Sequence, residues 1–98
     1  MDEEFQSAFL RGGNILTPER IIITDDSVTW KKRNSFLIGT DSKTIPIDSI
    51  ASIDIDQKLW GANITITSFG QDKIEAKNFT GADADRIKEL LEELRSNK

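Results

Sequence analysis

The feature that most constrains this fold is a succession of short β-strand patterns, separated only by turns, from Asn14 to Thr80. The clearest pattern is Ser52–Gln57, where Ile53 and Ile55 alternate with polar residues. A period of two is typical of a half-buried antiparallel strand. Parallel neighbours need a crossover of about a dozen residues or more, and the gaps between these patterns are shorter. The succession therefore predicts an antiparallel barrel or sandwich.

Turn residues delimit the other predicted strands. Asp25-Asp26-Ser27 predicts the turn of a β-hairpin. Pro46 predicts a strand end or an edge strand, because proline cannot donate to a ladder. Asp48-Ser49 then allows a tight turn around a barrel corner, with Ile50 turned inward. About seven antiparallel strands are expected, with these further patterns: 14–17, 20–24, 28–33, 36–38, 44–47, 62–68 and 73–79.

The end of the chain predicts one amphipathic helix over residues 83–97. Its apolar residues recur at the helical spacing i, i+3, i+4, i+7. They are Ile87, Leu90, Leu91 and Leu94. Thr80 followed by Asp83 matches a capping box, although Asp83 itself is the alternative cap. An apolar stripe of this kind must be covered, so we expect the helix to cap the strands.

The first residues predict a short N-terminal helix. Phe5 and Phe9 are four residues apart, and acidic residues stand at the start, where a helix dipole favours them. Gly12-Gly13 would end this helix. Because so short a helix is marginal in water, it must dock, either on its own domain or on a neighbouring subunit. A frayed leader is the third possibility.

The length of the chain sets the number of domains. Its 98 residues suffice for one hydrophobic core and not for two. We therefore expect a single domain over 1–98, with an N-terminal helix or arm at 1–13, strands over 14–80 and the capping helix at 83–97.

Two missing residue types limit the chemistry. The chain has no cysteine and no histidine, so it lacks the thiolate nucleophile, the commonest general base and the commonest metal ligands. No glycine-rich phosphate loop is present. Asp25-Asp26, and the pair Asp54 and Asp56, are better explained as a turn and a solvated strand face than as acid/base or cation sites. We expect no enzyme activity, no cofactor and no metal.

Charge and hydropathy constrain partners and location. The formal net charge is −4, which disfavours nucleic acid as a partner. No apolar run reaches the ~18 residues of a membrane-spanning helix. The N-terminus is acidic, unlike that of a signal peptide. A cytoplasmic location is expected.

The order of these patterns resembles the bacterial pleckstrin-homology-like (PH-like) domain family. The likeness is carried by Leu16–Thr24 as an opening strand and by Ile45–Ile55, which is similar to the family's I-P-Y/F-x-x-I-x-x-V-x-I core. Ile64–Phe79 is similar to the closing hairpin, and the final helix completes the order. Met1–Leu10 lies outside the likeness. The resemblance implies a mainly β fold, a PH-like barrel with a C-terminal helix, and a non-enzymatic binding or assembly module.

Apolar residues beyond the needs of one small barrel suggest protein contacts. We expect self-association or another protein partner. The candidate interface residues are Phe5, Phe9, Phe36, Leu37, Ile38 and Trp60. Trp60, at a predicted loop tip, could instead plug one end of the barrel.

Two alternative functions follow from other features. Lys31, Lys32 and Arg33, with Lys58, could contact an anion or an anionic membrane lipid, although Asp25-Asp26 would repel phosphate and a solvated strand face explains the triplet as well. The other alternative is an adaptor that binds peptides by adding a strand to an exposed sheet edge.

Overall fold

The computed structural model describes residues 2–7, 19–33, 40–59 and 61–97. Within them lie seven β-strands, a short 3-10 helix η2 (Ile47–Ser49) and one α-helix, α1 (Gly81–Ser96). The strands are β1 (Glu3–Gln6), β2 (Glu19–Ile23), β3 (Ser27–Arg33), β4 (Thr40–Pro46), β5 (Ile50–Lys58), β6 (Gly61–Ser68) and β7 (Lys73–Phe79).

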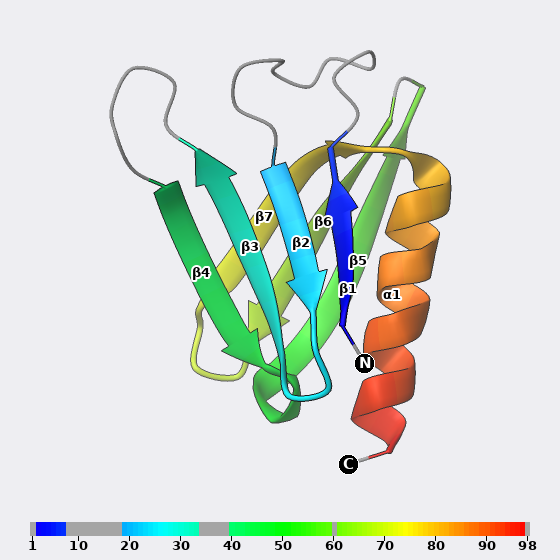
Figure 1. The fold of residues 1–98 in the computed structure, drawn as a ribbon. Coiled ribbons are helices and arrows are strands. Elements are labelled where there is room, and N and C mark those ends of the chain that lie inside the picture. Colours follow the sequence, from blue (N-terminus) through cyan, green and yellow to red (C-terminus); the bar gives the residue numbers. More distant parts are fainter. Residues whose placement is uncertain (1, 8–18, 34–39, 60, 98) are drawn as a thin grey trace.

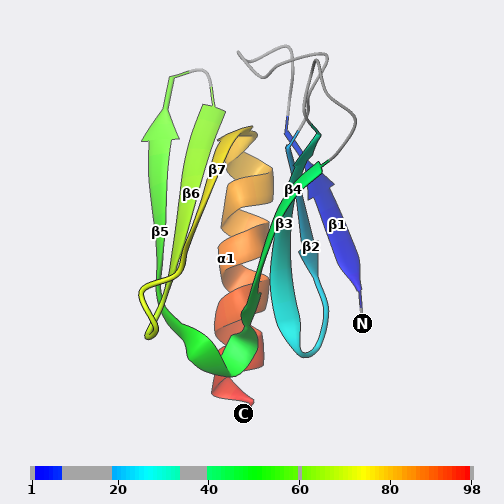
Figure 2. The same cartoon turned by 90° about the vertical axis from the view of Figure 1, so that its left-hand side faces the viewer.

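The strands form two antiparallel sheets. The first sheet has the order β1-β2-β3-β4, and the second has the order β5-β6-β7. The two sheets face one another, and α1 runs along the side where β1 and β5 lie (Figures 1 and 2). The predicted fold class, mainly antiparallel β with a C-terminal capping helix, is confirmed.

The predicted N-terminal helix is wrong for residues 3–6, which form β1. Phe5 lies opposite Ile21 and packs against the core, while Glu4 and Gln6 are exposed. Pairing with β2 supplies the backbone hydrogen bonds that an isolated short helix could not hold in water. The rest of that prediction, and the predicted strands at 14–17 and 36–38, lie outside the described residues.

One hydrophobic core joins both sheets to α1. Isoleucines from the two inner faces dominate it, and Phe79 is its largest fully buried side chain. The predicted helical stripe is confirmed, because Ile87, Leu90 and Leu91 are buried and Leu94 is partly buried. Each such side chain contributes ~1.5–3 kcal/mol when fully buried.

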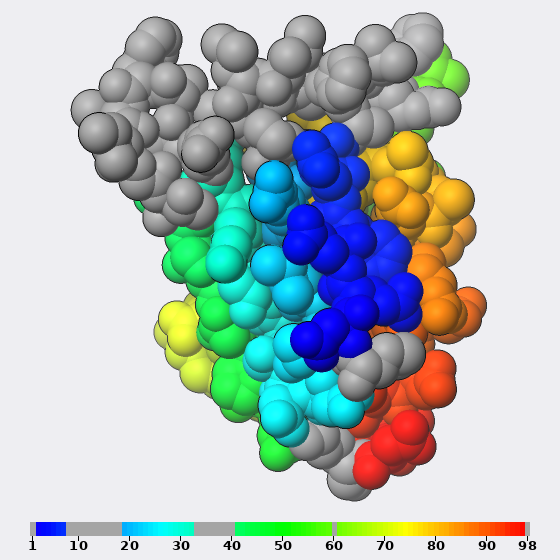
Figure 3. Space-filling view, viewed as in Figure 1, coloured from blue at the N-terminus to red at the C-terminus, as the bar shows by residue number. Residues whose placement is uncertain are grey.

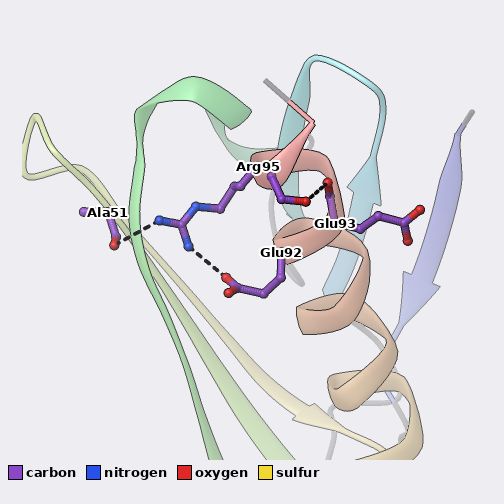
Figure 4. A network of polar contacts seen from close by, with 5 residues as sticks. Ala51, Glu92, Glu93 and Arg95 are labelled. Atoms are coloured by element: carbon purple, nitrogen blue, oxygen red, sulfur yellow. Dashed lines mark hydrogen bonds and ion pairs between the residues drawn. The ribbon is translucent and has the colours of Figure 1, made fainter.

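Both ends of α1 are fixed by polar contacts. Thr80 is the N-cap, and its Oγ1 accepts a hydrogen bond from the backbone N–H of Asp83 at 3.0 Å, as the first of the two cap predictions required. In the last turn, Arg95 Nη1 donates to Glu92 Oε1 at 2.8 Å and Nη2 donates to the carbonyl of Ala51 in β5 at 3.4 Å (Figure 4). Arg95 therefore ties the end of the helix to the second sheet.

The predicted corner between the sheets is confirmed. Pro46 ends β4 and η2 makes the turn; Ile47, the first residue of η2, and Ile50, which follows it, are both buried. The Asp25-Asp26 turn is also confirmed, with the Thr24 N–H donating to the Ser27 carbonyl at 2.9 Å.

Candidate functional site

Two sheets have four edge strands, here β1, β4, β5 and β7. An edge strand presents backbone N–H and C=O groups on which another chain can pair, so each edge is a possible binding surface. The four edges differ in how the rest of the described chain covers them.

Helix α1 lies beside the edges of β1 and β5. Arg86 Nη2 of the helix is 3.5 Å from Glu3 Oε2 of β1. Arg95 donates to a β5 carbonyl, as described above. In Figure 3, β1 (blue) lies directly against α1 (orange). Helix α1 therefore flanks both of these edges.

The edge of β7 is irregular. The β6–β7 register shifts between Ala62 and Ile64, so Lys77 and Asn78 together oppose Asn63. Asn78 has a φ of 66°, which asparagine tolerates better than most residues, and its N–H donates to Asn63 Oδ1. The N–H of Lys77 donates to Glu19 of the first sheet at 3.2 Å. This β-bulge interrupts a regular pairing edge.

The edge of β4 is regular and uncovered by any described strand or helix. Asp41, Ser42, Lys43 and Thr44 are all exposed. Successive residues of a strand point their backbone N–H and C=O groups to opposite neighbouring strands. Because Ser27 is hydrogen-bonded to Thr24 on the β2 side, the backbone groups of Val28, Trp30 and Lys32 point toward β4. Their partners on β4 are Ile45, Lys43 and Asp41. The backbone N–H and C=O groups of Ser42 and Thr44 therefore point away from β3, toward the open edge.

A groove runs beside this edge, between the two sheets. Its volume is about 500 Å³. The strands β4 and β7, which contribute to its lining, lie on the side away from α1 (Figure 2). Lys43 Nζ spans the sheets by donating to the Lys73 carbonyl at 3.1 Å. The groove is lined by Trp30, Asp41, Ser42, Lys43, Lys73 and Glu75. Acidic and basic side chains therefore alternate around one indole ring.

Glu19 holds that indole ring in place. Its side chain is on the inner face of β2, and the residue is only 8% exposed. Glu19 Oε1 accepts hydrogen bonds from Trp30 Nε1 at 2.8 Å and from the Lys77 N–H at 3.2 Å. The carboxylate thus links Trp30, which lines the groove, and β2 of the first sheet to β7 of the second sheet. Glu19 was not among the residues predicted from the sequence, although its place on the same period-two face as Ile21 and Ile23 was a signal that could have identified it.

The predicted basic residues are spread over the molecule. Lys31 is exposed on the outer face of β3, whereas Lys32 is on the inner face, directly between Glu19 and Asp41 in the strand register. Lys58 is on the second sheet, with its Nζ 3.0 Å from Asp56 Oδ2. Arg33 is the last residue of β3, and its side chain lies outside the description. The three described lysines do not form one cluster.

Most of the predicted apolar interface residues cannot be placed. Phe5 packs against the core. The other five, which are Phe9, Phe36, Leu37, Ile38 and Trp60, lie outside the described residues. Two exposed apolar side chains were not predicted: Leu59, 83% exposed just before Trp60, and Phe69, 73% exposed in the β6–β7 turn.

Among the described residues, no group of three or more acidic side chains is arranged to hold a metal ion. No helix in that part of the chain is long and apolar enough to cross a membrane.

Comparison with known proteins gives one family. The model of the bacterial PH domain family matches residues 2–93. The match begins before β1, so the family domain includes the N-terminal segment that the sequence resemblance left out. A comparison with curated proteins gives no match.

Proposed function

Because the chain belongs to the bacterial PH domain family, whose domains are generally non-catalytic, we propose that it is a non-enzymatic module that binds other protein chains by β-strand addition. The proposed site is the open edge of β4 together with the groove beside it. The observation that carries the proposal is the contrast among the edges within the described part of the chain: α1 flanks β1 and β5, a bulge interrupts β7, and β4 is regular and uncovered there.

Strand addition needs free backbone groups in a regular row. On β4 these are the outward N–H and C=O groups of Ser42 and Thr44, which an extended segment would pair with as a fifth strand of the first sheet. Pro46, which has no N–H, would end this pairing at one end of the strand.

The groove supplies a basis for selectivity. Side chains of an added strand alternate between the two faces, so every second one would lie over the groove. There it would meet Asp41 and Lys43 of β4, with Lys73 and Glu75 behind them. This lining favours a segment whose inward side chains carry opposite charges in the same alternation.

The alternative of an anionic lipid ligand receives less support from the same arrangement. In the strand register Lys32 lies between the acidic residues Glu19 and Asp41, and Lys58 is paired with Asp56. Anionic lipid head groups bind to clusters of basic residues that are not already paired with carboxylates.

The test uses a phage-displayed library of short random peptides, selected on the full chain. We expect binders whose addition shifts the backbone amide resonances of residues 41–45. Ser42→Pro should weaken their binding at least tenfold, since it removes an outward donor and leaves the β3 ladder bonds of Asp41 and Lys43 in place. Binding is measured by titration calorimetry.

Ser42→Ala is the matched control, because it shortens the same side chain and keeps the N–H. It should bind within about twofold of the unmodified chain. Urea unfolding of both variants verifies that the fold persists. Selected peptides that shift resonances of α1 or β5 and not of β4, or that bind Ser42→Pro undiminished, would refute strand addition at β4.

A further inference from the structure

The charges along β4 are complementary to themselves. Asp41 and Lys43 are two residues apart, so both side chains lie on the same, groove-facing face of the strand. Ser42 lies between them and points its backbone groups outward. A second copy of the same strand, running antiparallel about a twofold axis at Ser42, would place each Asp41 opposite the other copy's Lys43.

The backbone alternation agrees with this register. With Ser42 opposite Ser42, the residues that meet in hydrogen-bonded pairs are 40, 42 and 44, which are the ones whose groups point to the open edge. Asp41 and Lys43 then fall in the non-hydrogen-bonded pairs, where opposing side chains approach more closely. Opposite charges directly across from one another stabilise such a pair.

The neighbouring twofold registers are unfavourable. Moving the axis to Asp41 places Asp41 opposite itself, and moving it to Lys43 places Lys43 opposite itself. Like charges directly opposite one another are destabilising. Moving the axis to Thr44 brings Ser42 opposite Pro46, which has no N–H to donate. Charge and proline together therefore select one register.

On this basis we infer that one partner of the β4 edge is a second copy of this chain, joined through antiparallel β4–β4 pairing into a symmetric dimer. The inference rests on the proposed function and gives the partner of that same site. The two first sheets would continue as one sheet of eight strands. Because this interface is a single strand pair, it is smaller than the ~1,200–2,000 Å² of stable complexes, and the dimer should be weak.

The first measurement is sedimentation equilibrium of the full chain from about 10 µM to about 1 mM, a range that spans weak association. We expect the average mass to rise above the 11.0 kDa of one chain toward twice that value. Asp41→Lys and Lys43→Asp should each raise the dissociation constant at least tenfold, because each change sets like charges opposite one another.

Mixing the two variants gives the decisive result. A chain with Asp41→Lys carries two lysines on the edge, and a chain with Lys43→Asp carries two aspartates. The mixture should form a heterodimer although each variant alone is weakened. A chain carrying both changes should dimerise within about threefold of the original, because the complementarity is restored in reverse.

The controls make the same charge changes elsewhere. Asp54→Lys on β5 and Lys88→Asp on α1 alter exposed residues away from β4, and should leave the dissociation constant within about twofold. Because Lys43 also contacts the Lys73 carbonyl, urea unfolding monitors the fold of its variants, and Asp41→Lys tests the interface without that contact.

The outcomes separate the dimer from the proposed function. A chain that stays monomeric at the highest concentration, or variants whose mixture does not associate, would overturn the dimer. If library peptides still bind at β4 in that case, strand addition stands and a different partner occupies the edge. If neither dimer nor peptide binding at β4 is found, both proposals fail.

Discussion

At the scale of single residues, Glu19 is the side chain with the most structural consequences. A carboxylate is seldom buried unless its oxygens are hydrogen-bonded. Here Oε1 accepts from the Trp30 indole and from the Lys77 backbone, and the Glu19 N–H donates to Ser7 Oγ at 3.0 Å. Three strands, β2, β3 and β7, therefore meet at one residue.

Replacing Glu19 should lower the free energy of unfolding. Glu19→Ala leaves the Trp30 and Lys77 donors without their acceptor, and we expect a loss of ~2–4 kcal/mol. Glu19→Gln keeps an acceptor but loses the charge assistance, so a smaller loss of ~1–2 kcal/mol is expected. Urea unfolding followed by circular dichroism measures both values.

Glu4→Ala is the control for this pair. Glu4 is exposed on β1, with an oxygen 3.8 Å from Arg20 Nε, and such surface pairs contribute ~0–1 kcal/mol. If Glu19→Ala proved no more destabilising than Glu4→Ala, the carboxylate would not link the sheets as described.

At the scale of secondary-structure elements, α1 decides which edges are open. Its apolar stripe packs on the core, and its two arginines reach the β1 and β5 sides. The helix therefore flanks those two edges, and its docking depends on the stability of the helix itself. The hydrogen bond at the Thr80 N-cap is one contact that stabilises the helix.

Thr80→Ala should destabilise the domain by ~1 kcal/mol, because the Asp83 N–H loses its acceptor. For a domain of this size, that corresponds to a decrease in melting temperature of about 4–8 °C. Thr80→Ser keeps the hydroxyl and should recover most of the loss. Equal melting temperatures for Thr80→Ala and the unmodified chain, measured by differential scanning calorimetry, would contradict the role of this cap.

The elements themselves differ in how well the sequence predicts them. The alternation of Ile53 and Ile55, the stripe of α1 and the stop at Pro46 are local signals, so they predicted β5, the capping helix and the end of β4. Phe5 with Phe9 fits a helix spacing, but Phe5 also sits on the inner face of β1. The choice of a strand there depends on pairing with β2, a contact that no local pattern contains.

The candidate site depends still more on long-range contacts. The sequence predicted that an edge could accept a strand, and did not identify which edge. The difference between β4 and the other edges follows from where α1 docks and from the bulge at Asn78. Both features involve residues far from β4 in the chain. Likewise the triplet at Lys31 suggests one basic cluster in the sequence, and the pleat of β3 separates Lys31 from Lys32.

At the scale of the whole molecule, the described chain closes the two sheets with α1 along one side and places no helix along the other. On the closed side α1 bridges β1 and β5 (Figure 1). On the other side the sheets come together through Glu19 and through the Lys43–Lys73 contact, with the groove between them. This asymmetry leaves β4 as the uncovered regular edge among the described strands.

Hydrogen exchange of the β4 backbone amides tests this account most directly. In a dilute sample, the Ser42 and Thr44 amides should exchange quickly with deuterium, while the Asp41, Lys43 and Ile45 amides, bonded to β3, should be protected. As the chain is concentrated, or when a selected peptide is added, new protection among the amides of residues 41–45 should appear at Ser42 and Thr44. Protection of Ser42 and Thr44 equal to that of their neighbours at the lowest concentration would mean that the chain itself covers the edge, and would contradict the account.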